Sequence, residues 1–102
     1  MTLNDLEEII ASRKLADPDS SWTAKLLSSG VDKCAEKFGE ESIEAIIEAV
    51  KGDKAALTAE AADVLYHLMV MLAAADVALA DVMDVLGNRQ SQSGIAEKAG
   101  RS

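Results

Sequence analysis

The sequence contains few of the residues that form disulfides, zinc knuckles or stacked aromatic cores. Its 102 residues include one cysteine, one proline, one histidine and one each of Trp, Tyr and Phe. A single cysteine excludes an intrachain disulfide, and the lack of a second one excludes a zinc knuckle. Because 49% of the residues are hydrophobic but only 3% are aromatic, the core must be aliphatic. Helical bundles use such side chains readily.

Positive charge is also scarce. Ten Lys and Arg residues stand against 18 Asp and Glu residues, which leaves a net charge of −8. This balance argues against nucleic acid, which requires a basic surface, and against an anionic membrane surface. The acidic N-terminus lacks an apolar signal run, and no stretch approaches the roughly 20 apolar residues of a membrane span without interruption by charge. We therefore expect a cytoplasmic protein with no nucleic-acid or membrane partner.

Hydrophobic spacing predicts an all-α fold, an antiparallel bundle of about five helices without strands. Asn4 and Glu7 form a possible capping box, and Ser21 or Thr23 could cap the second helix. Glycines at the ends of the second and third helices, and a weaker one after the fifth, read as stops. The expected helices span residues 5–14, 21–27, 31–51, 54–75 and 79–86.

These helices are expected to form one domain, 1–102, with a flexible tail over about 88–102. The turn at Gly52 and Asp53 predicts a hairpin of the third and fourth helices. The fourth helix is apolar almost all round, so we expect it to be buried on most sides. Cys34 should be buried, and Gly39 indicates close approach of a ligand or a neighbouring helix, or a local irregularity of the third helix. Dimerisation should complete so small a bundle. The apolar stripe expected on the third helix is Val31, Ala35, Phe38, Ile43, Ile46 and Val50.

Acidic residues occur in two clusters within these apolar segments. Glu41 and Glu44 are three residues apart, as are Glu60 and Asp63. The two residues of each pair therefore share a helix face, where their like charges repel each other. Glu40 precedes the first pair, and Glu48 extends it by one turn. Such pairs also occur on solvated faces of acidic proteins, which is the simpler interpretation for the first pair alone.

Counting from the turn brings the two clusters together. Glu44 and Glu60 each lie eight residues from Gly52, and Glu41 and Asp63 each lie eleven residues from it. Four carboxylates would then converge in one groove, where two of them about 4 Å apart repel by about 4 kcal/mol at an effective dielectric of about 20. Oxygen ligands without thiolates favour Mg²⁺ or Mn²⁺, and open positions on such an ion suit phosphate chemistry.

A di-iron site is a rival use of such carboxylates, but it requires Glu-x-x-His motifs. The sequence has none, because its one histidine, His67, follows Asp63 by four residues. Spacing favours His67 as a partly buried histidine with its hydrogen bonds satisfied, or as a hydrogen-bonding neighbour of a ligand, over a ligand itself.

Four segments carry a resemblance to a known family. They are residues 21–27 (SWTAKLL), 37–44 (KFGEESIE), 60–67 (EAADVLYH) and 93–98 (SGIAEK). The acidic pattern Glu-Glu-x-x-Glu followed by Glu-x-x-Asp resembles the all-α, MazG-like nucleoside triphosphate pyrophosphatases. The first and last segments are similar to the phosphoribosyl-ATP pyrophosphohydrolases of histidine biosynthesis. The sequence departs from that pattern at Trp22, where a Tyr is expected, and at Ala78, where a Ser or Thr would cap the fifth helix.

The resemblance implies a dimeric enzyme that hydrolyses 1-(5-phosphoribosyl)-ATP to 1-(5-phosphoribosyl)-AMP and pyrophosphate, the second step of histidine biosynthesis. It implies Mg²⁺ held by Glu41, Glu44, Glu60 and Asp63, with Mn²⁺ as an alternative. Either Glu40 or a ligating glutamate, Glu41 or Glu44, would activate water. The candidate substrate contacts, some of which would otherwise be surface cations or a helix cap, are Trp22, Thr23, Lys25, Lys37 and Arg89.

Two other functions remain open at this point. The same fold could hydrolyse a free nucleoside triphosphate such as dCTP or dUTP. It could also be a non-catalytic helical dimerisation module, although that function leaves Glu60 and Asp63 unexplained in an apolar helix. A fused cyclohydrolase activity is excluded, because one Cys and one His cannot supply its metal ligands.

Overall fold

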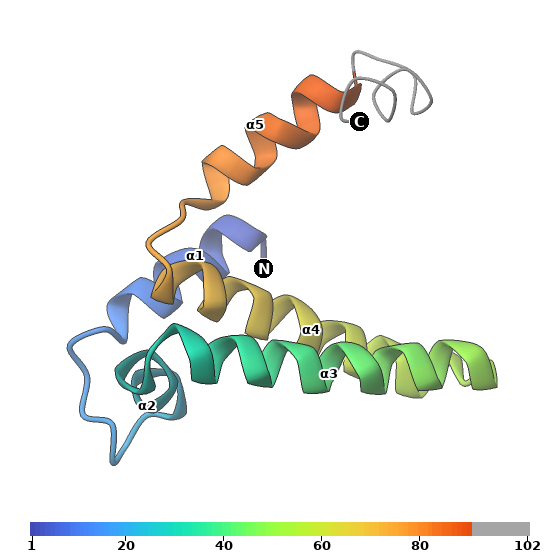
Figure 1. The fold of residues 1–102 in the computed structure, drawn as a ribbon, viewed down its shortest axis with the longest axis horizontal. Helices are drawn as coiled ribbons and strands as arrows, with labels where there is room; N and C mark the ends of the chain where they lie inside the picture. The colour runs from blue at the N-terminus through green and yellow to red at the C-terminus, as the bar shows by residue number, and fades with distance from the viewer. Residues whose placement is uncertain (91–102) are drawn as a thin grey trace.

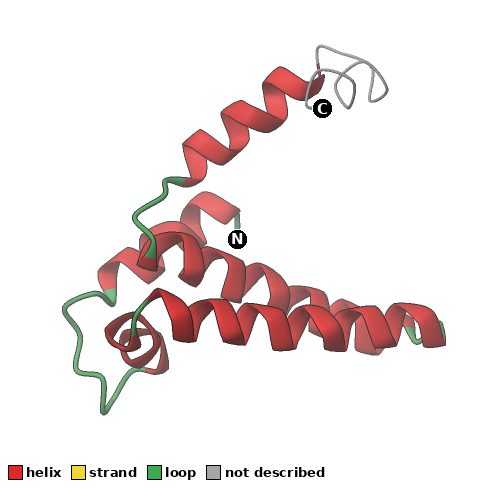
Figure 2. Cartoon of the chain, in the orientation of Figure 1, coloured by secondary structure: helices red, strands yellow, loops and turns green. Residues whose placement is uncertain are grey.

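The all-α prediction is confirmed by the computed structural model, which describes residues 1–90 (Figures 1 and 2). Five helices and no strand occur within these residues. The long helices α3 and α4 lie antiparallel and share the most extensive interface in the chain. The helices are α1 (Leu3–Ser12), α2 (Trp22–Ser29), α3 (Val31–Lys51), α4 (Lys54–Ala74) and α5 (Leu79–Gln90).

Helix α1 begins two residues earlier than predicted. Thr2 is its N-cap, and the Thr2 hydroxyl accepts a hydrogen bond from the Asp5 amide while the Asp5 carboxylate accepts one from the Thr2 amide. The predicted capping box of Asn4 and Glu7 is therefore wrong. Thr2 and Asp5 have the same three-residue spacing, so the sequence contains two overlapping signals and the structure uses the earlier one.

The hairpin and its caps agree with the sequence. Ser21, rather than Thr23, caps α2 by accepting a hydrogen bond from the Ala24 amide. Gly52 ends α3 in the left-handed conformation, with φ of 79°, and Asp53 caps α4 through the Ala56 amide. The left-handed residue reverses the chain within two residues, which fixes the register between α3 and α4.

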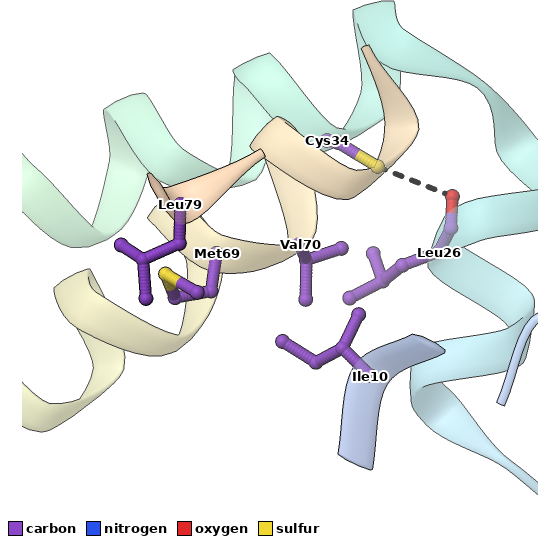
Figure 3. Close-up of a cluster of buried hydrophobic side chains, with 6 residues drawn as sticks. All are labelled: Ile10, Leu26, Cys34, Met69, Val70 and Leu79. Carbon is purple, nitrogen blue, oxygen red and sulfur yellow. Dashed lines mark hydrogen bonds between the residues drawn. The ribbon is translucent and has the colours of Figure 1, made fainter. Parts of the chain in front are cut away.

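The buried core lies at the end of the hairpin remote from Gly52, where the other helices meet it (Figure 3). Cys34 is buried there, as predicted, and its Sγ donates a hydrogen bond to the Leu26 carbonyl oxygen at 3.3 Å. All five helices contribute to this cluster, which consists of Ile10, Leu26, Cys34, Met69, Val70 and Leu79.

The predicted burial of α3 and α4 is wrong for the single chain. On α3, Ile43, Ile46 and Val50 are 60%, 61% and 84% exposed. On α4, only His67, Met69 and Val70 are buried. Periodicity measures how apolar a face is, but it does not show what covers that face. The face that α3 turns toward α4 carries Glu41 and other acids instead, so its apolar stripe points outward.

Helix α5 runs further than predicted, through Gly87 to Gln90. Residues 88–90, expected to begin a flexible tail, are therefore helical, and the rest of that predicted tail lies outside the described residues. From its first turn, α5 projects away from the α3–α4 hairpin (Figure 1). A single glycine weakens a helix by about 1 kcal/mol relative to Ala, which neighbouring residues can offset.

Among residues 1–90, α4 is the one helix long and apolar enough to cross a membrane by length and composition alone. Core helices of water-soluble bundles pass the same test. The acidic residues Glu60 and Asp63 interrupt the apolar surface of this helix near Glu41 of α3. Its composition is therefore weak evidence for a membrane span.

Two glycines give a matched test of the hairpin. Gly52→Ala should destabilise the protein by about 1 kcal/mol, because a side chain is strained at φ of 79°. Gly39→Ala should stabilise it by up to about 1 kcal/mol, because Gly39 is inside α3 and an added Cβ would meet no atom of the chain within 4 Å. Urea unfolding measures both changes. Equal effects would contradict the assigned turn, and a destabilising Gly39→Ala would show that a ligand or another molecule approaches that residue.

Candidate active site

The acidic residues of α3 and α4 converge as the count from Gly52 predicts. Glu41, Glu60 and Asp63 each offer a carboxylate oxygen, and the three oxygens lie within 4.8 Å of one another. Glu44 lies three residues after Glu41 on α3, and its carboxylate raises the pKa of both Glu41 and Glu60. We call Glu41, Glu44, Glu60 and Asp63 the acidic groove. Glu48 lies one turn further along α3, where Lys51 Nζ approaches it to 3.8 Å.

The acidic groove is electrostatically strained. Burial raises the pKa of Glu60, and the Glu44 carboxylate raises it further by hydrogen bonding and by repulsion. The pKa of Glu41 is raised by burial and then by the charge of Glu44. Glu60 Oε2 is itself buried and accepts no hydrogen bond from residues 1–90. A buried carboxylate oxygen without a donor costs free energy of folding. A positive charge in the acidic groove would remove this cost.

The donors of the acidic groove fit a hard divalent cation. All of them are carboxylate oxygens, the ligands that Mg²⁺ and Mn²⁺ prefer. Exposed acidic clusters are common without a metal, and Asp63 is exposed. The buried, unpaired Glu60 Oε2 distinguishes this groove from such a surface cluster. A cation would supply the partner that this oxygen lacks.

His67 borders the acidic groove from α4. It is 7% exposed, which confirms the predicted burial. Its Nε2 lies 3.9 Å from Glu41 Oε1, too far for a hydrogen bond, and its Nδ1 is buried without a partner among the described residues. Burial lowers the pKa of His67, and Lys37 adds to this effect while Asp63 and Glu40 oppose it. The neutral imidazole is therefore favoured.

A hydrogen bond between α2 and α4 was not anticipated from the sequence. The Thr23 hydroxyl pairs with the Tyr66 hydroxyl, and the Tyr66 ring meets the His67 ring edge to face, with centroids 5.0 Å apart. Thr23 is thus tied to α4 rather than capping α2. Tyr66 follows Thr23 by 43 residues, a separation at which no local pattern signals a contact.

The other predicted site residues fall into two groups. Lys37 Nζ pairs with Glu40 Oε2 at 3.3 Å, and on α3 Lys37 precedes Glu41 by four residues, about one turn. Trp22 and Lys25 instead line an open hollow of about 350 Å³, together with residues 18–21. Arg89 lies in the last turn of α5, which points away from the hairpin (Figure 1).

The fold and the groove together define an all-α protein with a carboxylate site between two antiparallel helices. Comparison with known proteins narrows this class: the pattern of the phosphoribosyl-ATP pyrophosphohydrolases matches residues 3–90. The phosphoribosyl-ATP pyrophosphatase of Dinoroseobacter shibae is 73% identical over 94% of each chain. That of Ruegeria sp. (strain TM1040) is 72% identical over 97% of this chain and 94% of its own length. The chain belongs to the phosphoribosyl-ATP pyrophosphohydrolase family, as the resemblance predicted.

The raised pKa of Glu60 predicts how the metal-free protein responds to pH. A raised pKa in the folded state means that folding favours the protonated carboxyl group. Stability is then greatest below the usual glutamate pKa of 4.5 and declines as pH rises through the raised value. At pH 7.5 without divalent cations, Glu60→Gln should raise the thermal midpoint, because the substitution removes a carboxylate that is ionised at this pH beside other carboxylates. Differential scanning calorimetry measures this change.

In the presence of Mg²⁺, the wild type should have a higher thermal midpoint than Glu60→Gln. The ion should raise the midpoint of the wild type but leave that of Glu60→Gln almost unchanged, because the variant lacks one carboxylate of the acidic groove. Glu36→Gln is the matched control, since Glu36 is exposed on α3 and pairs with Lys33 at 3.6 Å. An equal Mg²⁺ effect on the wild type and Glu60→Gln would contradict a cation site at Glu60.

Proposed function

We propose that this protein hydrolyses 1-(5-phosphoribosyl)-ATP to 1-(5-phosphoribosyl)-AMP and pyrophosphate, the second step of histidine biosynthesis. The observation that carries this proposal is the acidic groove, which occurs in a chain of the phosphoribosyl-ATP pyrophosphohydrolase family. Its relatives of 67–73% identity bear the name phosphoribosyl-ATP pyrophosphatase. A cytoplasmic location is part of the proposal, because this substrate is an intracellular nucleotide.

The acidic groove would hold Mg²⁺, or Mn²⁺ in its place, through Glu41, Glu44, Glu60 and Asp63. When bound, such an ion offsets the charge of phosphate oxygens during phosphoryl chemistry. The raised pKa values of Glu41 and Glu60 support this role, since a nearby cation lets both carboxylates ionise. The same geometry explains why these acids persist in an apolar hairpin.

The remaining candidates would act on the substrate and on water. Water attacks the α-phosphorus, the bond to the β-phosphate oxygen breaks, and pyrophosphate leaves. Glu40, or a glutamate of the acidic groove, would accept the proton of that water. Lys37 lies about one turn before Glu41 on α3 and could contact phosphate. Lys25 and Arg89 are further phosphate candidates, and the half-exposed Trp22 beside Lys25 could stack on a base.

We further propose a homodimer. Helices α3 and α5 each expose several large apolar side chains and α4 exposes one, and an apolar surface of this extent is rare on a monomer. A second copy of this chain is the occupant that the family resemblance implies. The exposed residues are Ile43, Ile46, Ile47, Val50, Leu65, Met83, Val85 and Leu86.

Ile46→Glu should disrupt this dimer, because it places a charge within the apolar face of α3. Sedimentation equilibrium should give a dimer for the wild type and a largely monomeric species for the variant. Glu36→Gln, on the same helix, should remain dimeric. A monomeric wild type at micromolar concentration would contradict the proposal.

Catalysis should depend on the acidic groove. Glu44→Gln and Asp63→Asn should each lower kcat/KM for phosphoribosyl-ATP by at least about a hundredfold, in the range seen when one group that stabilises phosphoryl charge is removed. Pyrophosphate release in the presence of Mg²⁺ is the measurement. Glu36→Gln should retain full activity.

The same assay separates the alternative functions. Efficient hydrolysis of dCTP or dUTP, with little hydrolysis of phosphoribosyl-ATP, would favour the free-nucleotide enzyme. No pyrophosphate release from any substrate, together with no Mg²⁺-dependent thermal shift, would leave a helical dimerisation module. Full activity of Glu44→Gln and Asp63→Asn would place the reaction elsewhere on the chain.

A further inference from the structure

The N-terminus of α5 is bound by a residue of α1. The Leu79 amide donates a hydrogen bond to Glu7 Oε2 at 2.8 Å, across 72 residues of sequence. The local N-cap position is Ala78, whose side chain cannot accept a hydrogen bond. Glu7 therefore performs part of the capping that a Ser or Thr at 78 would supply locally. The negative charge of the carboxylate also suits the positive end of the helix dipole.

Glu7 and Leu79 are anchored in the packed end of the molecule. Leu79 is 5% exposed and belongs to the core cluster with Ile10 and Met69 (Figure 3). Glu7 and Ile10 line a cavity of about 20 Å³ together with Val77, so the Glu7 stem lies against the core. One side of the half-buried Glu7 thus borders the core, and its other side lines an open surface hollow.

The preceding turn fixes the other end of the connection between α4 and α5. Asp76 is left-handed, with φ of 59°. The Val77 amide donates to the Leu72 carbonyl oxygen at 2.9 Å, and the Asp76 amide donates to that of Ala73 at 3.2 Å. This pattern ends α4 in a defined direction. The path from α4 into α5 is therefore held by hydrogen bonds on both sides of Ala78.

Small changes in the direction of α5 have large effects at its far end. The most extensive contact that α5 makes with another helix is with α1, and it is small. Arg89 lies ten residues after Leu79, or about 15 Å along the helix axis. A rotation of about 20° at Leu79 would move Arg89 by about 5 Å, and misplacing a contact by about 1 Å can cost a hundredfold in rate.

We propose that Glu7 is a positioning residue that sets the direction of α5 through the Leu79 amide and thereby places Arg89 for the substrate phosphates. The first part stands on the hydrogen bond and its packing. The second part rests on the proposed function. Glu7 touches neither the acidic groove nor the reacting atoms in this role.

Hydrogen exchange of the intact protein tests the first part without any substrate. Glu7→Ala should speed exchange of the amides of residues 79–82 about fivefold to tenfold, the range expected for a lost helix cap. Glu7→Gln keeps an acceptor oxygen, so its amide exchange rates should lie between those of the wild type and those of Glu7→Ala. Glu8→Ala is the matched control, because Glu8 is exposed and lines the same surface hollow as Glu7. Unchanged exchange in Glu7→Ala would overturn the proposal.

Steady-state kinetics test the second part. Glu7→Ala and Arg89→Ala should each raise KM for phosphoribosyl-ATP, and the double variant should be no worse than Arg89→Ala alone. Glu7→Ala with Ala78→Asp restores a local cap but not the link to α1. We expect it to recover amide protection but not KM, which separates helix stability from helix direction.

Each alternative result contradicts one of the two parts of the proposal. Additive effects of Glu7→Ala and Arg89→Ala, or full recovery of KM by Ala78→Asp, would overturn the placement of Arg89 by Glu7. An unchanged KM in both Glu7→Ala and Arg89→Ala would also overturn this placement of Arg89. If the wild type released no pyrophosphate, the proposed function and the role toward Arg89 would both fail. The exchange data would still decide whether Glu7 holds α5.

Discussion

Repulsion among the carboxylates of the acidic groove is the constraint on which the rest of the structure depends. The left-handed Gly52 fixes the register of α3 against α4, and that register brings Glu41, Glu60 and Asp63 within 4.8 Å. Carboxylates held this close repel one another, and this repulsion contributes to the raised pKa values of Glu41 and Glu60. Packing at the far end of the hairpin, around Val70 and Cys34, must hold α3 and α4 together against this repulsion.

The inward position of the acids determines what α3 presents to its surroundings. A helix has one side facing its partner, and here Glu41 and Glu44 occupy part of it. The apolar stripe of Ile43, Ile46 and Val50 consequently points outward and is largely exposed. An apolar helix face left open to solvent is rare on a stable monomer. The acidic site and the uncovered apolar face are thus two consequences of one register, and a second copy of the chain is the partner we propose for that face.

The sequence predicts those parts of the molecule that depend on local counting. The helix ends at Gly52 and Asp53 and the convergence of Glu41 with Asp63 follow from distances along the chain, and the structure has all of them. Contacts between distant segments leave no such signal. The hydrogen bonds from Thr23 to Tyr66 and from Leu79 to Glu7 join residues 43 and 72 positions apart. The burial of α4 was overestimated for a related reason, since its composition does not reveal whether the chain itself or a partner covers it.

Three local rules are broken in this chain, and each break indicates a partner outside its own segment. Acidic residues three apart on α3 and α4 disfavour both helices, and a divalent cation would relieve them. Exposed Ile and Val on α3 disfavour a monomer, and a second copy would cover them. Ala78 leaves α5 without a local cap, and here the partner is visible, because Glu7 of α1 accepts the Leu79 amide. A sequence can therefore show that a segment is incomplete without showing what completes it. For α5 that information is tertiary, and it makes the direction of the helix a property of α1 as much as of α5 itself.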